Sequence, residues 1–386
     1  MARTATGVLF ECILITAFAV LLLEGASRVL HWGVRPMLPS TLDDAFAPRM
    51  PARFDSWISV YGGPKFRVCT DQFGLRKSSC EGEEVPAKVV VVGDSQAFGW
   101  GMPYSDSFSV KVARSLGTGE ETARSMAAGG ADIEGLYGWA RDYRSKGGPQ
   151  AAVNIVVVNL GNDLDEMYFG RSSHPTMLLK SLRSWLTVHS YLMLDITLLK
   201  YKLLGVGEWY LPPGANPVVF SLNSQERSQL ASGTAAAAVR LLRALPPAQH
   251  SVVLLMPQDY QVARSEFAKY QRFYPSTAQF EGWSKRISEA ASRLDDIERS
   301  IAQDLHSQGI VVVRPKGRLA THDPLAVIDR NSHHYTALGQ GLIAAAIVEA
   351  LQKGAVPPAQ GDLVHGLPVT VGFGTGHQSV PPGEGK

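Results

Sequence analysis

The sequence has few cysteines and no block of like charge, and both absences restrict its class. Cys12, Cys69 and Cys80 are the only cysteines in 386 residues, and they form neither a CxxC pair nor a zinc-ligand spacing. Lysine and arginine together number 37, against 35 aspartates and glutamates, so the net charge is +2. With no basic run in the chain, we expect no nucleic-acid partner.

Several motifs of known chemistry are also missing. Alanine occupies position 97 in GDSQA, so the serine is not part of a GxSxG nucleophile elbow. Neither GxxxxGK[ST] nor a GxGxxG after a strand occurs, which argues against nucleotide binding, and HExxH is absent.

The amino terminus carries a long apolar run. Residues 6–23 are apolar apart from Glu11 and small polar residues, and this length is near the lower limit for a membrane-spanning helix. Glu24 stands beside GAS at 25–27, a poor cleavage site, so we predict an uncleaved signal anchor over residues 1–31. Arginines on both sides of the run leave its orientation open.

We expect the bulk of the chain outside the cytoplasm, in the periplasm or its equivalent. Cys69 and Cys80 flank a short polar segment, and a disulfide between them would agree with export. Two unrelated thiols would fit the sequence equally well.

Strands and helices alternate between residues 61 and 352. Continuous β-branched runs, typical of strands buried on both faces, lie at 88–94, 154–163, 251–257 and 309–315. Amphipathic or apolar helical patterns lie between and after them, at 107–117, 281–309 and 336–354. The alternation predicts an α/β domain with a parallel sheet covered by helices.

Three other segments depart from this alternation. Residues 32–60 are proline-rich, and we predict a linker. Residues 164–230 combine an apolar helical pattern with a turn-rich loop, and we predict a helical insertion. It could form a lid or flap, face the membrane, or pack on the core. Residues 355–386 are rich in glycine and proline, which predicts a disordered tail.

Polar side chains follow the ends of three predicted strands or connections. Ser95 follows the first strand, Asn162 and Asp163 follow the next, and His333 and His334 precede the last helix. In open parallel sheets, ligands bind beyond the carboxyl ends of the strands. A serine hydroxyl needs an adjacent base to act as a nucleophile, and the oxyanion that forms needs preorganised donors. The order serine, asparagine, histidine therefore indicates acyl transfer.

The same residues resemble the SGNH/GDSL hydrolase superfamily in four blocks spread over about residues 60–352. VVVVGDSQAFGWG resembles the first block, with Ser95 as nucleophile, and SMAAGGADIEG resembles the second. VVVNLGNDLDEM resembles the third, with Asn162, and HYTALGQGLIAAAI the last. In the last block a glycine follows the catalytic histidine by five residues, and this spacing selects His334 over His333.

The resemblance implies a flavodoxin-like three-layer αβα sandwich and ester hydrolysis without cofactor or metal. It implies an oxyanion hole formed by Ser95, Asn162 and the backbone of Gly129, with Gly130 as the neighbouring choice. The family's acid usually lies two or three residues before the histidine, where this chain has Ser332 and Asn331. Asp329 is our candidate for this acid, with Asp323 in reserve or no acid at all.

Three functions follow from this resemblance. The first is an esterase acting on an acylated carbohydrate or lipid, and the second an acyltransferase to a surface glycan. The third is an inactive glycan-binding or assembly protein, which the altered acid position favours. We expect Asp94 to hold the loop through backbone N–H groups and not to act as the triad acid. We expect Gly93 to provide a tight turn.

Overall fold

A computed structural model of the chain describes residues 5–37, 49–60, 65–129, 131, 133–161, 163–164, 167, 190–193, 195–196, 199, 222–262, 276–329 and 334–353. Asn162, most of the predicted insertion 164–230 and the predicted tail 355–386 lie outside the described residues.

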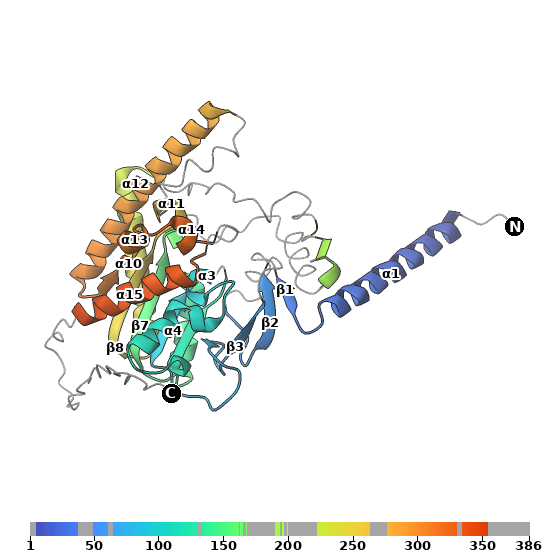
Figure 1. Cartoon of the computed structure of the whole chain (residues 1–386), viewed down its shortest axis with the longest axis horizontal. Helices are drawn as coiled ribbons and strands as arrows, with labels where there is room; N and C mark the ends of the chain where they lie inside the picture. The colour runs from blue at the N-terminus through green and yellow to red at the C-terminus, as the bar shows by residue number, and fades with distance from the viewer. Residues whose placement is uncertain are drawn as a thin grey trace, which may run out of the picture. The chain divides into compact units, whose positions relative to one another are not determined.

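One mixed sheet forms the centre of the domain (Figure 1). Within the described residues it has nine strands in the order β1-β2-β3-β4-β6-β5-β7-β8-β9. The strands are β1 (Arg35–Met37), β2 (Asp55–Val60), β3 (Lys65–Thr70), β4 (Arg76–Lys77), β5 (Val89–Gly93), β6 (Ala123–Ala127), β7 (Ala151–Asn159), β8 (Ala248–Met256) and β9 (Val311–Val313).

The last five strands of this order are all parallel to one another. Their sequence order across the sheet, from β6 to β9, is 2-1-3-4-5, which is the flavodoxin-like arrangement. The predicted α/β fold is therefore confirmed. All five residues of β5 are buried, as expected for a strand covered on both faces.

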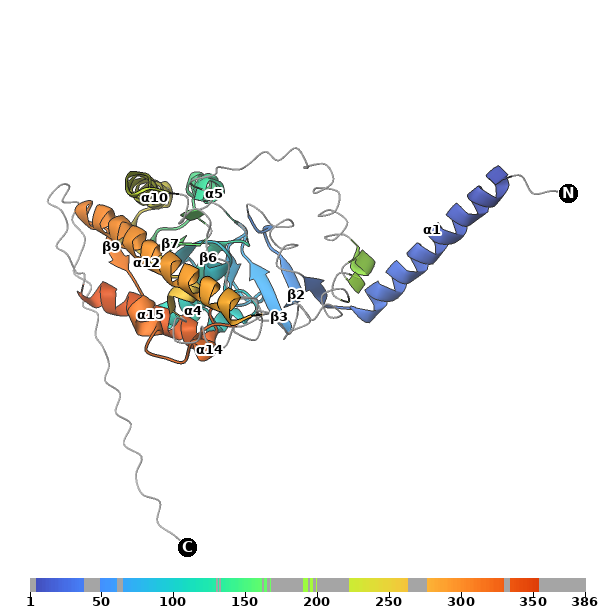
Figure 2. The ribbon, with the colours of Figure 1, turned by 90° about the horizontal axis from the view of Figure 1, so that it is seen from above.

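Helices cover both faces of the parallel strands (Figure 2). The longer ones are α4 (Phe108–Ser115), α5 (Ile133–Ser145), α10 (Ser224–Ala244), α12 (Thr277–Ser307) and α15 (Ala337–Lys353). The short ones are α3 (Ser95–Phe98), α11 (Asp259–Val262), α13 (Lys316–Leu319), α14 (Pro324–Val327), η1 (Tyr104–Asp106) and η2 (Glu120–Thr122). Helix α10 packs between α5 and α12 in one layer, and α4 packs against α15 in the other.

The sheet extends beyond the predicted amino-terminal boundary at residue 61. Strands β2, β3 and β4 form an antiparallel meander that joins the parallel part through the pairing of Arg76 with Ser125. Strands β1 and β2 lie in the segment 32–60, which the sequence predicted as a linker. These strands have only three and six residues, so their pattern does not stand out from that of a linker.

The amino-terminal helix α1 spans Ala5–Leu30. Its segment Glu11–Leu30 has a mean hydropathy of 1.9 and is only 6% buried, so by length and composition it could cross a membrane or act as a signal sequence. Near its end, the Glu24 carboxylate accepts hydrogen bonds from Ser190 Oγ (2.7 Å) and from the backbone N–H of Leu192 (3.0 Å). The helix is therefore joined to a described part of the predicted insertion.

Candidate active site at the carboxyl end of the sheet

Ser95 begins the short helix α3 directly beyond strand β5 and is partly accessible. Gly93 pairs with Ala127 of β6, and Ser95 and Gly129 each follow their strand by two residues. Val92 pairs with Val156 of β7 on the other side, and Asn159 at the end of β7 bonds to Asp94. Three adjacent parallel strands therefore end at one edge, where ligands bind in open sheets of this kind.

Gly93 has a role different from the turn that we expected. It is the last buried residue of β5, and its φ angle is not in the left-handed region. A Cβ atom built on it would lie 2.8 Å from the Cβ of Ala97 and 2.9 Å from the Cβ of Val157. Glycine is needed here because helix α3 and strand β7 approach the backbone closely.

Asp94 organises the loop that carries Ser95, as the sequence predicted. One carboxylate oxygen caps α3 by accepting a hydrogen bond from the Gln96 N–H (2.9 Å). The other accepts from Asn159 Nδ2 at 2.6 Å. The buried carboxylate is thus committed to holding β5, α3 and β7 in register.

Asn159 is a residue that sequence analysis missed, and it links this loop to strand β8. Its side-chain oxygen accepts hydrogen bonds from Gln258 Nε2 (2.8 Å) and from the Gly161 N–H (3.1 Å). Its own N–H donates to a carboxylate oxygen of Asp163 at 2.8 Å. The available signal was an asparagine at the end of an otherwise apolar strand, since buried amides are nearly always fully bonded.

His334 lies against the loop that carries Ser95. Its ring stacks on that of Trp100, with the ring centroids 5.6 Å apart and the planes 21° from parallel. The next residue, Tyr335, donates its N–H to Gln96 Oε1 at 3.4 Å. The segment carrying the candidate base therefore contacts residues one and five positions after the candidate nucleophile.

Asp329 lies directly opposite His334. Ile328 and Tyr335 form an antiparallel bridge, and beside it the Asp329 N–H donates to the His334 carbonyl at 2.7 Å. Side chains of directly opposite residues in an antiparallel pair point to the same side. Asp323 precedes α14 and is exposed, and its carbonyl accepts the backbone N–H of Ala326.

Two neighbours fix the position of the His334 segment. The Tyr335 hydroxyl donates to the Pro257 carbonyl beyond β8 at 2.8 Å, and burial raises the pKa of this phenol well above its ordinary value, so it stays a donor. On the other side, a Cβ on Gly339 would lie 2.3 Å from the Val327 carbonyl oxygen. The glycine five residues after the histidine therefore lets helix α15 reach the bridge.

A fully buried arginine, Arg76, holds the loop that follows Ser95 through hydrogen bonds. The Arg76 guanidinium donates to the carbonyls of Phe98 (2.5 Å), Gly99 (2.9 Å) and Met102 (2.9 Å). Burial lowers the pKa of this group to about 10, and the ring of Phe98 stacks beneath it at 4.4 Å. These carbonyls bracket Trp100, so Arg76 fixes the ring that stacks on His334.

The structure thus places the His334 segment, with Asp329 opposite it, against the loop that carries Ser95. Gly129 is buried two residues beyond β6. Asn162 lies outside the described residues, as does the alternative Gly130. A hydroxyl, an imidazole and a carboxylate are the groups that nucleophilic acyl transfer needs, and their individual roles here stay predictions.

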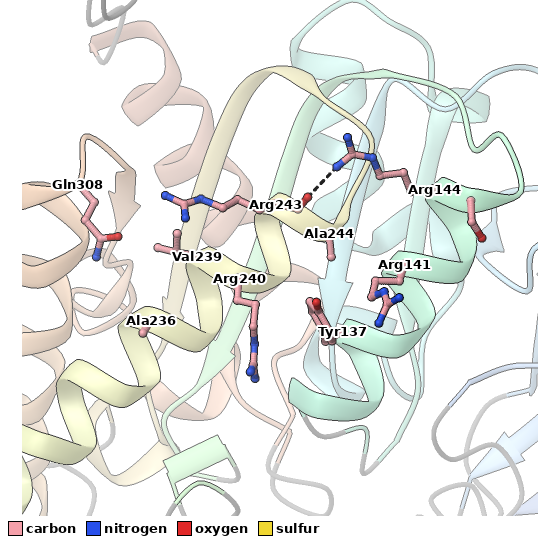
Figure 3. Close-up of a pocket in the computed structure, with 10 residues that line it drawn as sticks. Tyr137, Arg141, Arg144, Ala236, Val239, Arg240, Arg243, Ala244 and Gln308 are labelled. Carbon is pink, nitrogen blue, oxygen red and sulfur yellow. Dashed lines mark hydrogen bonds between the residues drawn. The ribbon is translucent and has the colours of Figure 1, made fainter.

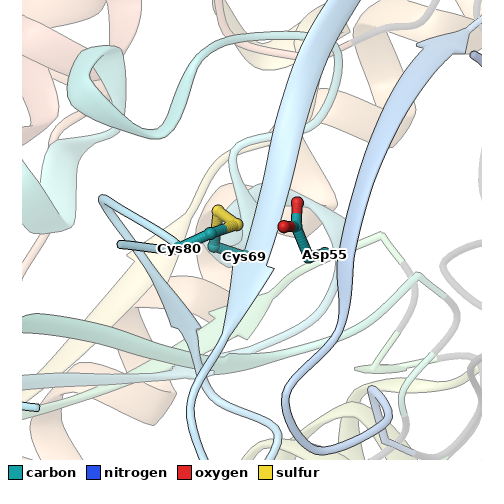
Figure 4. Close-up of side chains that lie close together, drawn as sticks. All are labelled: Asp55, Cys69 and Cys80. Atoms are coloured by element: carbon teal, nitrogen blue, oxygen red, sulfur yellow. A yellow bond between two sulfur atoms is a disulfide. The ribbon is translucent and has the colours of Figure 1, made fainter. Parts of the chain in front are cut away.

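A second cluster, of Asp55, Cys69 and Cys80, has metal-ligand atom types within 4.8 Å of one another (Figure 4). The two cysteines form a disulfide, which answers the question that the sequence left open. The Asp55 carboxylate forms a two-point ion pair with Arg67, at 2.8 Å for each contact, which lowers the pKa of Asp55. This cluster has no thiolate left for a metal and is a structural crosslink between β3 and the segment after β4.

Comparison with protein-family models and with curated proteins finds no match for this chain. Solved structures with a similar fold include a lipase from a goat rumen metagenome (13% identity, TM-score 0.36, 70% of this chain and 97% of that one). They also include an acetylxylan esterase from Geobacillus stearothermophilus (12% identity, TM-score 0.34, 70% and 96%). A candidate SGNH hydrolase from Slackia heliotrinireducens is a third (12% identity, TM-score 0.32, 69% and 100%).

Proposed function

We propose that the protein is a serine ester hydrolase. Ser95 is the nucleophile, His334 the general base and Asp329 the carboxylate that orients the imidazole. The observation that supports this most directly is the contact of the His334 segment with the Ser95 loop at both Gln96 and Trp100. Residues separated by more than 200 positions meet there, beside the candidate nucleophile.

The mechanism follows the chemistry of these groups. His334 removes the proton of Ser95 Oγ as the oxygen attacks the ester carbonyl. The backbone N–H groups of Ser95 and Gly129, with the amide of Asn162, stabilise the oxyanion. His334 then gives the proton to the departing alcohol oxygen, which leaves an acyl-serine. A water molecule, deprotonated by His334, cleaves this ester, releasing the acid and restoring the serine.

The proposed substrate is an acyl or acetyl ester of a carbohydrate or lipid outside the cytoplasm. Helix α1 would anchor the domain to the membrane. The Cys69–Cys80 disulfide supports an oxidising compartment, because such bonds are rare in the cytosol.

The test is hydrolysis of p-nitrophenyl acetate by the full chain in detergent. We expect Ser95→Ala and His334→Ala each to lower kcat by roughly 10⁴-fold, as removal of a triad member does elsewhere. Asp329→Ala should lower kcat less, and Asp323→Ala should leave it unchanged. Ser292→Ala is the matched control, since this exposed serine of α12 donates to the Ser288 carbonyl of its own helix.

The proposal would be contradicted if the unmodified protein hydrolysed the ester no faster than Ser95→Ala and a fluorophosphonate probe did not label Ser95. A different result would identify an acyltransferase that uses the same residues. In that case the probe labels Ser95, hydrolysis is slow, and the acyl group is transferred faster to the hydroxyl of an added sugar.

A further inference from the structure

A groove rich in arginine lies between the carboxyl-terminal halves of helices α5 and α10 (Figure 3). Its volume is about 740 Å³. Four arginines line it, namely Arg141, Arg144, Arg240 and Arg243. Helices α5 and α10 lead into the first residues of β7 and β8, so the groove lies at the amino end of the sheet, away from Ser95.

The charges in the groove are only partly compensated. Arg240 forms an ion pair with Glu134 of α5. Arg144 donates to the Arg243 backbone carbonyl at 2.9 Å, which satisfies a helix end but neutralises no charge. None of the described residues that line the groove carries a carboxylate. The site therefore has a surplus of positive charge.

The preference of helix ends for positive charge explains two of these four arginines. Arg144 and Arg243 stand in the last turns of α5 and α10, where positive charge is favoured by the helix dipole. Arg141 and Arg240 stand earlier, and they flank the ring of Tyr137 from the two helices (Figure 3). Their guanidinium carbons lie 5.8 and 5.0 Å from the ring centroid, so the ring holds both forks at the groove.

The chemistry of this surface selects a ligand with more than one oxyanion. Guanidinium groups bind carboxylates through two parallel hydrogen bonds, and the arginines offer several such forks. Ala236, Val239 and Ala244 supply small apolar contacts between them. A concave groove can enclose a chain-like ligand, whereas a flat membrane surface cannot enter it. We propose that this groove binds an acidic oligosaccharide through its carboxylate groups, independently of the hydrolase function.

The experiment is calorimetric titration of the full chain, in neutral detergent, with a short oligogalacturonate. An uncharged maltooligosaccharide of the same length is the ligand control and should not bind. The double substitution Arg141→Gln and Arg240→Gln should weaken binding by at least about tenfold, because two charge-assisted contacts are lost. Arg299→Gln is the matched control, since this arginine is exposed on α12 and paired with Asp296, and it should leave affinity unchanged.

Glu134→Gln is a second variant with the opposite expectation. It frees Arg240 from its ion pair, so binding should tighten by about threefold, the scale of a surface pair. This variant also tests the proposal if the double variant does not fold. The proposal is overturned if Glu134→Gln weakens binding, or if the double variant binds like the unmodified chain. It is equally overturned if a DNA oligonucleotide or phosphatidylglycerol nanodiscs bind as tightly as oligogalacturonate.

Discussion

The two ends of the parallel sheet hold their polar side chains in different ways. At the carboxyl end, Asp94 and Asn159 are buried and bond to each other and to neighbouring strands. At the amino end, the groove arginines stand at the surface, and two of them, Arg141 and Arg240, contact the ring of Tyr137. Buried polar groups must be satisfied within the fold, whereas exposed ones stay available to a ligand. The first end is therefore rigid and sensitive to substitution, and the second should tolerate it.

The largest effect on stability that we expect tests the packing of the carboxyl end. Gly339→Ala puts a Cβ within 2.3 Å of the Val327 carbonyl, a contact with backbone that cannot yield easily. We expect a loss of about 3 kcal/mol in the free energy of unfolding, as for overpacked cores, together with lower esterase activity.

Gly341→Ala is the control for this effect, two residues along the same helix. Its Cβ would meet only the Lys111 side chain, at 3.5 Å. This substitution should stabilise the protein by roughly 0.5–1 kcal/mol, because alanine favours the helix more than glycine does. Thermal unfolding of both variants gives the comparison. Equal effects would mean that α15 does not fix the His334 segment through Gly339.

The next effect compares two buried asparagines on strand β7. Asn159→Leu removes the bonds to Asp94 and Gln258, and Asn154→Leu removes the bond to the Pro246 carbonyl at the other end. Each should lower the free energy of unfolding by about 2 kcal/mol, the cost of partners left unsatisfied. Only Asn159→Leu should also lower kcat, since only it disturbs the Ser95 loop.

Urea unfolding and p-nitrophenyl acetate hydrolysis would measure the two quantities separately. A parallel loss of kcat in Asn154→Leu would show that activity follows stability alone and would remove the distinction between the two ends.

The smallest effect concerns the surface pair of Asp142, on α5, and Arg49. A hydrogen bond from Arg49 lowers the pKa of the Asp142 carboxyl. Because the native pKa is below the unfolded one, the pair stabilises the fold above the unfolded pKa and loses this contribution as pH falls through the native pKa. Arg49→Gln should therefore lower Tm slightly at neutral pH and not in acid, and high salt should shrink the difference. A difference that persists in acid would contradict the ion pair.

The chain's own pattern predicted much of the fold, whereas the site residues stay predictions. Apolar runs identified strands β5, β7, β8 and β9, and the helical patterns identified α4, α12 and α15. Strand β6 was missed, because Arg124 and Ser125 interrupt its apolar pattern. Buried Arg124 contacts the Asp71 carboxylate and donates to the Val85 carbonyl, and both partners come from distant parts of the chain.

The sequence alone determined that Ser95 follows the apolar strand β5, since local periodicity and turn residues are properties of adjacent positions. Gly129 and His334 were selected by the resemblance to the family blocks and not by local periodicity. The tertiary structure alone decided that Asn159 bonds to Asp94 beside Ser95 and that Trp100 stacks on His334. It also set the surplus of arginine between α5 and α10. Strand order and register depend on how helices pack across the sheet, and these contacts join residues that no local pattern connects.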